Sequence, residues 1–510
     1  MLLLALAGPV AGQPSLSPDT VVLDVVAMSD PAERYALYLP RLTPGRRPPV
    51  LLLMDPRGRA ALPLAAFRPA ASRLGYVVLS SYNTLSDEND DTVARANGRA
   101  LTAMITDAVN RYGGDPARVY LVGLSGAASY AWGAAAALEG RVAGVVGVGC
   151  PLTPDLHPVR TATSPFDYVA VVGTTDYNYD AAVVLDEALN TTRRPHRLLA
   201  FSGEHGWPPE PVAREAVEWL HYQAVGRGLA PKDIQWADSL GGTYLARARD
   251  HAAVGDDEAA LQLYRAAGGG RGPGAQEARR LAEDIARSPR GQQARERVLD
   301  HARRYFDYER DVAAFAALYR AIGPLPLAEA LDALGLDRLA AAVDTAGAEE
   351  ADAARRMLAL AYVVTAFYEP RALLKRGDWA KAAGFLQISR AILPDAPHAC
   401  YGLAQAESQR ARFPQALEAL GCAAAGGVVD RGLLSADPLL APLRRDERFQ
   451  ALADGLPDRR SPPTRSLLGP LLGTLEGSPA TRTAPRGPLT ALLHDVAGEH
   501  AGLAPPIRGG

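Results

Sequence analysis

The stretch that decides the fold reads Arg118-Val119-Tyr120-Leu121-Val122-Gly123-Leu124-Ser125-Gly126-Ala127-Ala128. An apolar, β-branched run ends at Gly123, a serine follows two residues later, and a small-residue helix begins at once. A sharp strand-to-helix turn needs small neighbours, because the serine backbone is strained and its flanks approach the next strand closely. The pattern therefore predicts that Ser125 Oγ is exposed at the carboxyl edge of a sheet and at a helix N-terminus.

Outward from this turn, short β-branched runs alternate with helical stretches up to about residue 225. Continuous apolar runs are typical of central strands in a mostly parallel sheet that helices bury on both faces. The first two runs lie close together and predict a hairpin, and the later alternation predicts a doubly wound α/β domain over residues 18–225. The expected strands are Val21–Met28, Arg34–Leu39, Pro49–Asp55, Tyr76–Ser81, Val119–Gly123, Gly144–Gly149, Tyr168–Gly173 and Arg197–Phe201.

A candidate acid and a candidate base follow later strands of this domain. Thr174-Thr175-Asp176 comes directly after the seventh strand, and Asp180 is a competitor four residues on. Ser202-Gly203-Glu204-His205-Gly206 follows the last strand in a glycine-flanked loop. In doubly wound α/β folds with a nucleophilic serine at such a turn, the catalytic residues come in the order Ser, Asp, His. Ser125, Asp176 and His205 fit that order, each at the carboxyl end of a strand.

Other histidines fit less well. His157 follows the sixth strand and is a weaker alternative, whereas His196 precedes a strand and His221 lies within a helix. The chemistry predicted for the set is proton transfer from Ser125 to His205 during attack on a carbonyl, with Asp176 orienting the imidazole.

The oxyanion formed in that attack needs backbone N–H donors. The N–H of Gly126, directly after the serine, is the first candidate. The second is expected in the loop after the third strand, Met54-Asp55-Pro56-Arg57-Gly58-Arg59. Proline has no N–H, so Arg57 or Gly58 must donate.

Four pieces of this sequence resemble a known family: Asp55-Pro56-Arg57-Gly58, Gly123-Leu124-Ser125-Gly126-Ala127, Gly173-Thr174-Thr175-Asp176 and Gly203-Glu204-His205-Gly206-Trp207-Pro208. Residues 21–222 are similar to α/β-hydrolases of the polyhydroxyalkanoate depolymerase and feruloyl-esterase type. The resemblance implies ester hydrolysis without naming a substrate. Two departures stand out: Ala127 replaces the last glycine of the serine motif, and Asp55-Pro56 replaces a His-Gly dipeptide.

The character of the chain changes after about Pro231 to Ala, Leu, Arg and Glu at helical spacing. Ala382, Leu386 and Ser389 recur 34 residues later as Ala416, Leu420 and Ala423, and Leu403-Ala404 supplies a large–small pair between them. A weaker copy follows Gly255 with Ala260, Tyr264 and Ala267. This spacing resembles the tetratricopeptide repeat, so residues 231–455 are predicted to form a helical domain that binds a protein partner.

Composition excludes several other functions. The net charge of −3 and the absence of a marked Lys/Arg run give no indication of a nucleic-acid partner. Three cysteines, Cys150, Cys400 and Cys422, lack metal-ligand spacing. We expect buried free thiols, although Cys400 and Cys422 could pair. No metal or cofactor is implied.

Both ends of the chain differ from its centre. Residues 1–12 resemble the apolar core and cleavage region of a secretory signal, although a basic leader is missing. An extracytoplasmic location, periplasmic or secreted, follows from that assignment, and no other stretch is apolar enough to predict a membrane span. Residues 456–510 accumulate Pro, Gly, Arg and Ser and are expected to be largely disordered.

Three functions compete. An esterase is favoured; a serine peptidase would use the same three residues, and a scaffold with a vestigial hydrolase domain would use the helices alone. The connection Pro151–Pro165 is too short and proline-rich for a helical lid, which suits an acyl ester or peptide presented on a larger molecule. Loop residues after the strands are candidates to line the pocket: Tyr82, Asn83, Tyr177 and Tyr179.

Overall fold

The computed structural model describes residues 18–41, 45–86, 91–138, 140–152, 166–192, 194–230 and 233–457. Four features predicted above lie outside the described residues. They are the signal segment 1–12, the alternative base His157, nearly all of the tail 456–510 and most of the lid-free connection between Pro151 and Pro165.

The chain divides into two compact units. The sheet unit comprises Met1–Gly173, Ala181–Phe201 and Gly206–Glu296. The helical unit comprises Arg297–Gly510 together with two short loops that follow strands, Thr174–Asp180 and Ser202–His205. We call these two segments the acid loop and the histidine loop.

An eight-stranded sheet forms the centre of the sheet unit, in the order β1-β2-β4-β3-β5-β6-β7-β8. The first two strands form the predicted antiparallel hairpin, β2 joins β4 antiparallel, and all later pairs are parallel. Every strand lies within two residues of its predicted bounds. The strands are β1 Thr20–Val26, β2 Arg34–Leu39, β3 Val50–Met54, β4 Val77–Ser81, β5 Val119–Leu124, β6 Gly144–Val148, β7 Asp167–Gly173 and β8 His196–Phe201.

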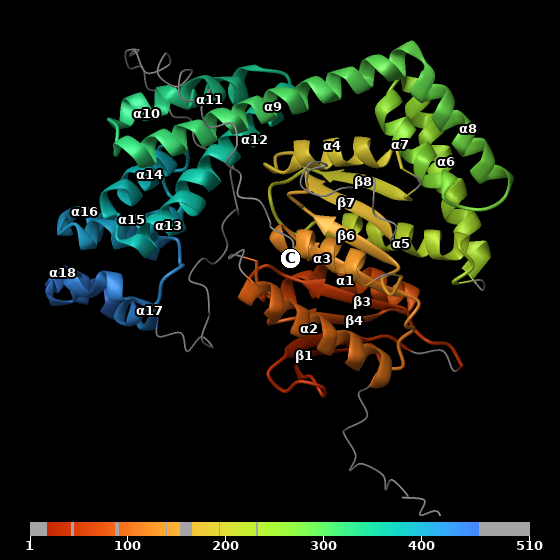
Figure 1. The fold of residues 1–510 in the computed structure, drawn as a ribbon, viewed down its shortest axis with the longest axis horizontal. Helices are drawn as coiled ribbons and strands as arrows, with labels where there is room; N and C mark the ends of the chain where they lie inside the picture. The colour runs from red at the N-terminus through yellow and green to blue at the C-terminus, as the bar shows by residue number, and fades with distance from the viewer. Residues whose placement is uncertain are drawn as a thin grey trace, which may run out of the picture. The chain divides into compact units, whose positions relative to one another are not determined.

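Helices cover both faces of this sheet (Figure 1). The apolar runs of β3 and β5 are wholly buried, which explains why they lack an alternating pattern. Connections between parallel strands are right-handed. The face that a connecting helix covers therefore depends on the direction in which the chain moves along the sheet to its next strand. Thus α1 (Ala61–Leu74) packs with α5 (Glu210–Gly226) on one face. The other face carries α2 (Asp91–Asn110), α3 (Gly126–Ala137) and α4 (Tyr179–Leu189).

Three helices beyond residue 231 belong to the sheet unit rather than to the helical one. Tyr244 and Tyr264 are buried in the same apolar cluster as Trp219 of α5. The change in composition near residue 231 marks the end of the strands, whereas the division into compact units falls at Glu296 because these helices pack around α5. They are α6 (Ile234–Val254), α7 (Asp257–Gly268) and α8 (Pro273–Arg287).

The helical unit is built from successive helices around a second apolar core. The six repeat positions predicted on α14 and α16 are all buried, as are Leu403 and Ala404 on α15. The tetratricopeptide-like character of the region remains a prediction. The elements are α9 (Pro289–Ile322), whose residues up to Glu296 belong to the sheet unit, α10 (Leu327–Ala333), α11 (Leu336–Thr345), α12 (Ala348–Val363), a π-helical turn (Val364–Tyr368), α13 (Glu369–Arg376), α14 (Trp379–Ile392), α15 (Pro397–Gln409), α16 (Phe413–Ala425), α17 (Arg431–Ala436), a 3-10 segment (Pro438–Arg445) and α18 (Glu447–Asp454).

The continuous helical segment Ala348–Arg376 is long and apolar enough to cross a membrane by length and composition alone. More than half of its most apolar window is buried inside the structure. Leu360, Tyr362 and Val363 belong to the core of the helical unit, which is the pattern of a core helix.

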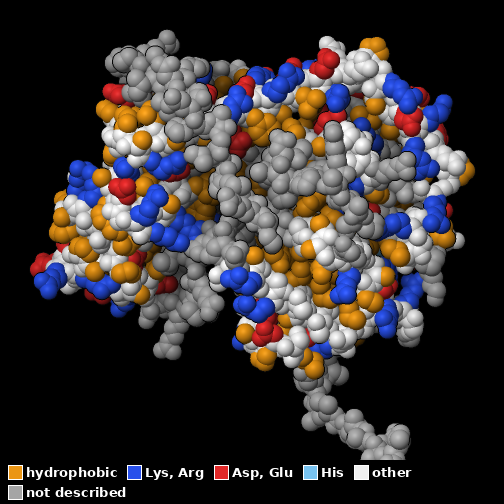
Figure 2. Space-filling view, viewed as in Figure 1, with side chains coloured by type: hydrophobic (Ala, Val, Ile, Leu, Met, Phe, Trp, Pro, Cys, Tyr) orange, Lys and Arg blue, Asp and Glu red, His pale blue; other side chains and the backbone are white. Residues whose placement is uncertain are grey.

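On the face visible in Figure 2, basic and acidic side chains are interspersed among apolar and neutral ones.

One sequence expectation is wrong. Cys400 and Cys422 are not free thiols but form a disulfide, with their Cα atoms 5.9 Å apart. The physical reason is that α15 and α16 pack side by side in opposite directions, so the start of one helix faces the end of the other. Cys150 is free and buried, as expected.

We predict that the disulfide stabilises the helical unit. A 22-residue separation corresponds to a lost denatured-state entropy worth about 3 kcal/mol. The double variant Cys400→Ala/Cys422→Ala should lower the free energy of unfolding by about that amount in urea titrations of the full chain. Reductant should shift the wild-type midpoint and leave the double variant unchanged; a wild-type midpoint insensitive to reductant would contradict the prediction.

Candidate active site

Ser125 occupies the turn between β5 and α3 in a strained backbone conformation, with φ 55° and ψ −129°. Among the described residues only three non-glycine residues have positive φ, and Ser125 is one of them. Such a conformation costs energy and persists where the surroundings over-determine it. Here the Ser125 N–H donates to Val148 O of β6 at 2.8 Å. The turn is therefore fixed by the neighbouring strand.

The small residues of the motif are needed by close approach. A Cβ on Gly123 would lie 2.4 Å from Ala127 O, and one on Gly126 would lie 2.7 Å from Ser86 Cβ. Ala127, which replaces the last glycine of the motif, fits as a buried residue of α3. Because it is the first amide of α3, the Gly126 N–H has no acceptor within its own helix. This N–H group is available to donate a hydrogen bond to an anion next to Ser125.

The strand order and this turn identify the architecture. An antiparallel hairpin leads into a run of parallel strands, and a strained serine follows β5, the fifth strand of the sheet in chain order. This is the α/β-hydrolase fold. The loops after β5, β7 and β8 all leave the same edge of the sheet, because those strands are parallel.

His205 and Asp176 are hydrogen-bonded to each other. The imidazole Nδ1 lies 3.0 Å from Asp176 Oδ1 and 2.9 Å from Oδ2. Asp176 is 1% exposed and also accepts the Asn178 N–H at 2.8 Å. A carboxylate on Nδ1 fixes the neutral tautomer that leaves Nε2 as the proton acceptor. This is the arrangement required of a general base and its orienting acid.

Two further contacts join the acid loop to the histidine loop. Gly203 O accepts both the Thr175 N–H at 3.0 Å and the Thr175 hydroxyl at 2.8 Å. The ring of Tyr177 stacks against the His205 imidazole, with centroids 4.6 Å apart and planes inclined by 32°. Backbone, carboxylate and aromatic ring therefore restrain His205 together.

The competing residues have other contacts. Asp180 is ion-paired with Arg356 at 2.8 Å. His196 contacts Asn190 Oδ1 and Arg194 O. His221 lies between the Tyr76 hydroxyl and Asp233 in the core. Structural roles account for all three side chains.

Asp55 organises the loop after β3. Its buried carboxylate accepts the backbone N–H groups of Arg57 and Arg59, the Arg59 guanidinium and the indole N–H of Trp207, all at 2.9–3.2 Å. Burial alone would raise the pKa of Asp55, but hydrogen bonds and charge from Arg59, with help from Trp207, hold it below its usual value. The carboxylate thus ties the loop to Trp207, two residues beyond His205, a role that the sequence did not predict.

This loop gives no support to the second oxyanion donor. The Arg57 N–H donates to Asp55 Oδ1 at 2.9 Å, and the Gly58 N–H donates to Asp55 O at 3.1 Å. Both predicted amides are already engaged inside the turn. Of the three predicted oxyanion donors, the Gly126 N–H is the one that is not hydrogen-bonded to Asp55.

The aromatic and amide residues expected to line the pocket differ in their roles. Tyr177 is buried against His205, and Tyr179 lies beneath the Arg356 guanidinium. The Tyr82 hydroxyl donates to Leu23 O, and Asn83 binds the backbone of Arg34 and Ala32. Asn83 therefore anchors the hairpin connection instead of a ligand.

The free cysteine also lies after a strand of the sheet. Cys150, after β6, is buried, and burial raises the pKa of its thiol to about 12. It stays protonated and unreactive at neutral pH. No group of three or more His, Cys, Asp or Glu side chains suited to a metal occurs among the described residues.

No protein-family model matches this chain, and no curated protein matches it. Solved structures with similar folds include a fluorophosphonate-binding serine hydrolase of Staphylococcus aureus (12% identity, 40% of this chain and 99% of that chain, TM-score 0.33). The Bacillus cereus carboxylesterase (18%, 38% and 95%, TM-score 0.31) and the Pyrobaculum calidifontis esterase (16%, 41% and 87%, TM-score 0.34) are others. These likenesses concern only the fold.

We predict that Gly58 is essential to the β3 loop. It has φ +67°, and a Cβ there would lie 2.2 Å from Tyr82 O, whereas Gly75 has φ +73° with nothing within 4 Å. Gly75→Ala should cost about 1 kcal/mol for the left-handed backbone. Gly58→Ala should cost about 1–3 kcal/mol more, because the loop must move away from Tyr82. Urea titration measures both, and equal losses would contradict the prediction.

Proposed function

We propose that the protein is a serine hydrolase that cleaves carboxylic esters through an acyl-enzyme intermediate, with Ser125 as nucleophile, His205 as base and Asp176 as its orienting acid. The strained backbone of Ser125 at the carboxyl end of β5 carries the proposal. Strain of this kind is retained at functional sites, and an N-capping serine needs none. The His205–Asp176 hydrogen bond supports the assignment of the base.

The reaction follows from these groups. His205 Nε2 accepts the Ser125 hydroxyl proton while Oγ bonds to the ester carbonyl carbon. The tetrahedral oxyanion accepts the Gly126 N–H. The bond to the alcohol then breaks as His205 returns its proton to the departing oxygen. Water repeats the sequence, releasing the acid and restoring Ser125.

The proposal extends to location and partners. The Cys400–Cys422 disulfide supports an extracytoplasmic location, because disulfides persist in oxidising compartments and are rare in the cytosol. The helices beyond residue 297 supply the surface on which a protein partner, or an acyl substrate carried on a larger molecule, would bind.

Labelling with a fluorophosphonate tests the nucleophile. The probe reacts with an activated serine, so wild-type protein should be labelled and Ser125→Ala and His205→Ala should not. Turnover of p-nitrophenyl esters should fall by about 10⁴–10⁶-fold in both variants, because triad members act as a unit.

His196→Ala is the matched control, since it removes a histidine at the opposite end of β8 and should retain labelling. Absence of labelling in folded wild-type protein would contradict the proposal. Labelling that survives in Ser125→Ala would assign the nucleophile to another residue.

A further inference from the structure

The acid loop, Thr174–Asp180, is packed into the helical unit rather than standing free beyond β7. Tyr177 belongs to the apolar core formed by α9 and the later helices. The Tyr305 hydroxyl on α9 donates to Tyr177 O. Burial, with help from Tyr368, raises the pKa of Tyr177 well above its usual value, so its ring against His205 stays neutral.

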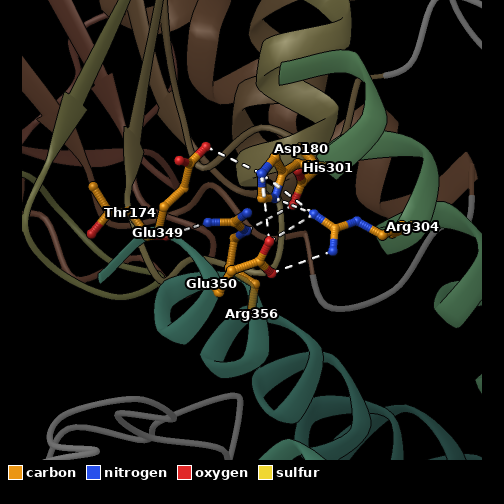
Figure 3. Close-up of polar contacts among 7 residues, drawn as sticks. All are labelled: Thr174, Asp180, His301, Arg304, Glu349, Glu350 and Arg356. Carbon is orange, nitrogen blue, oxygen red and sulfur yellow. Dashed lines mark hydrogen bonds and ion pairs between the residues drawn. The ribbon is translucent and has the colours of Figure 1, made fainter. Parts of the chain in front are cut away.

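Arg356 on α12 holds the two ends of this loop. Its Nε donates to Asp180 Oδ2 at 2.8 Å, and its Nη1 donates to Thr174 O at 3.0 Å (Figure 3). The guanidinium also lies over the Tyr179 ring, 4.5 Å from its centroid. Asp176 lies between the two anchored residues in sequence. A single planar, five-donor group therefore fixes the segment that carries the proposed acid.

The pair is buried on both sides, with Arg356 and Asp180 side chains 5% and 2% exposed. Burial raises the pKa of Asp180, while the charges of Arg356 and His301 oppose that rise. In the same cluster, the Arg304 guanidinium forms an ion pair with Glu350. The hydrogen bond from Arg304 holds the pKa of the Glu350 carboxyl below its usual value. His301 contacts Glu349 at 3.2 Å in the same cluster (Figure 3).

A buried ion pair of this kind is weak evidence for added stability, because desolvation offsets the attraction. Its value here is geometric, since the second donor of Arg356 reaches a backbone carbonyl of the acid loop. A hydrophobic pair could fill the same space but could not bind Thr174 O.

We infer that Arg356 is a positioning residue: by binding Asp180 and Thr174 O it fixes the acid loop so that Asp176 meets His205 Nδ1. The inference rests on the proposed function for its catalytic consequence, although the Asp176–His205 hydrogen bond can be observed without turnover. Within the helical unit, α12 thereby positions the loop that carries the proposed acid.

The test uses full-length protein labelled with ¹⁵N-histidine. The Nδ1–H proton of His205, assigned by its loss in His205→Gln, reports the bond to Asp176, and Asp176→Ala defines the signal when the acceptor is gone. In Arg356→Gln the signal should move toward the Asp176→Ala position or broaden. The kcat for a p-nitrophenyl ester should fall by about 10²-fold, as expected for a misplaced catalytic group, with KM unchanged.

Arg355→Gln is the matched control. It makes the same change one residue away on α12, where Arg355 pairs with Asp352 at 2.8 Å, and should leave the signal and kcat unaltered. Arg356→Lys keeps the positive charge beside Asp180 but lacks the planar guanidinium with several donors. It should therefore recover part of the His205 signal and part of kcat. If Arg356→Gln does not fold, Arg356→Gln/Asp180→Asn replaces it, because that variant leaves no unpaired buried charge.

An unchanged His205 signal and unchanged kcat in the folded glutamine variant would overturn the inference, as would a wild-type signal already at the Asp176→Ala position. A normal wild-type signal that shifts in Arg356→Gln, in a protein that no fluorophosphonate labels, would support the positioning role and reject the proposed function.

Discussion

The hydrogen bond between Asp176 and His205 decides what this site can do. A carboxylate on Nδ1 holds the imidazole proton there and leaves the opposite nitrogen to accept a proton. The remaining features of the site restrain the two partners: Thr175 joins their loops, Tyr177 stacks on the imidazole, and Arg356 anchors the acid loop from α12. Without such restraints two loop residues would sample many orientations, and a misplaced base loses much of its effect.

Much of this was predictable because the signals are local. A continuous apolar run identifies a buried strand, and parallel strands deliver their following loops to one edge, so the order Ser125, Asp176, His205 carries positional information. The glycines at 123 and 126 indicated close approach, and the structure has backbone or side-chain atoms where a Cβ would lie. For the same reason the strand bounds agree with those predicted.

The features that escaped prediction depend on contacts between separate elements of the fold. Arg356 and Asp180 are 176 residues apart in the sequence, and Trp207 and Asp55 are 152 residues apart. No local sequence pattern predicts either contact. The Cys400–Cys422 bond follows from the packing of α15 on α16, which helical periodicity does not specify. Likewise, composition located the end of the strands near residue 231, but the burial of Tyr244 and Tyr264 beside Trp219 places the next three helices with the sheet.

The proposed function requires that Ser125 becomes acylated during turnover. Rapid acid quench after mixing with excess p-nitrophenyl acetate, followed by mass analysis of proteolytic fragments, tests it most directly. We expect a burst of p-nitrophenol of about one equivalent per enzyme and an acetyl group on the fragment containing Ser125. Turnover without an adduct, or an acetyl group on another residue that disappears as product forms, would contradict it.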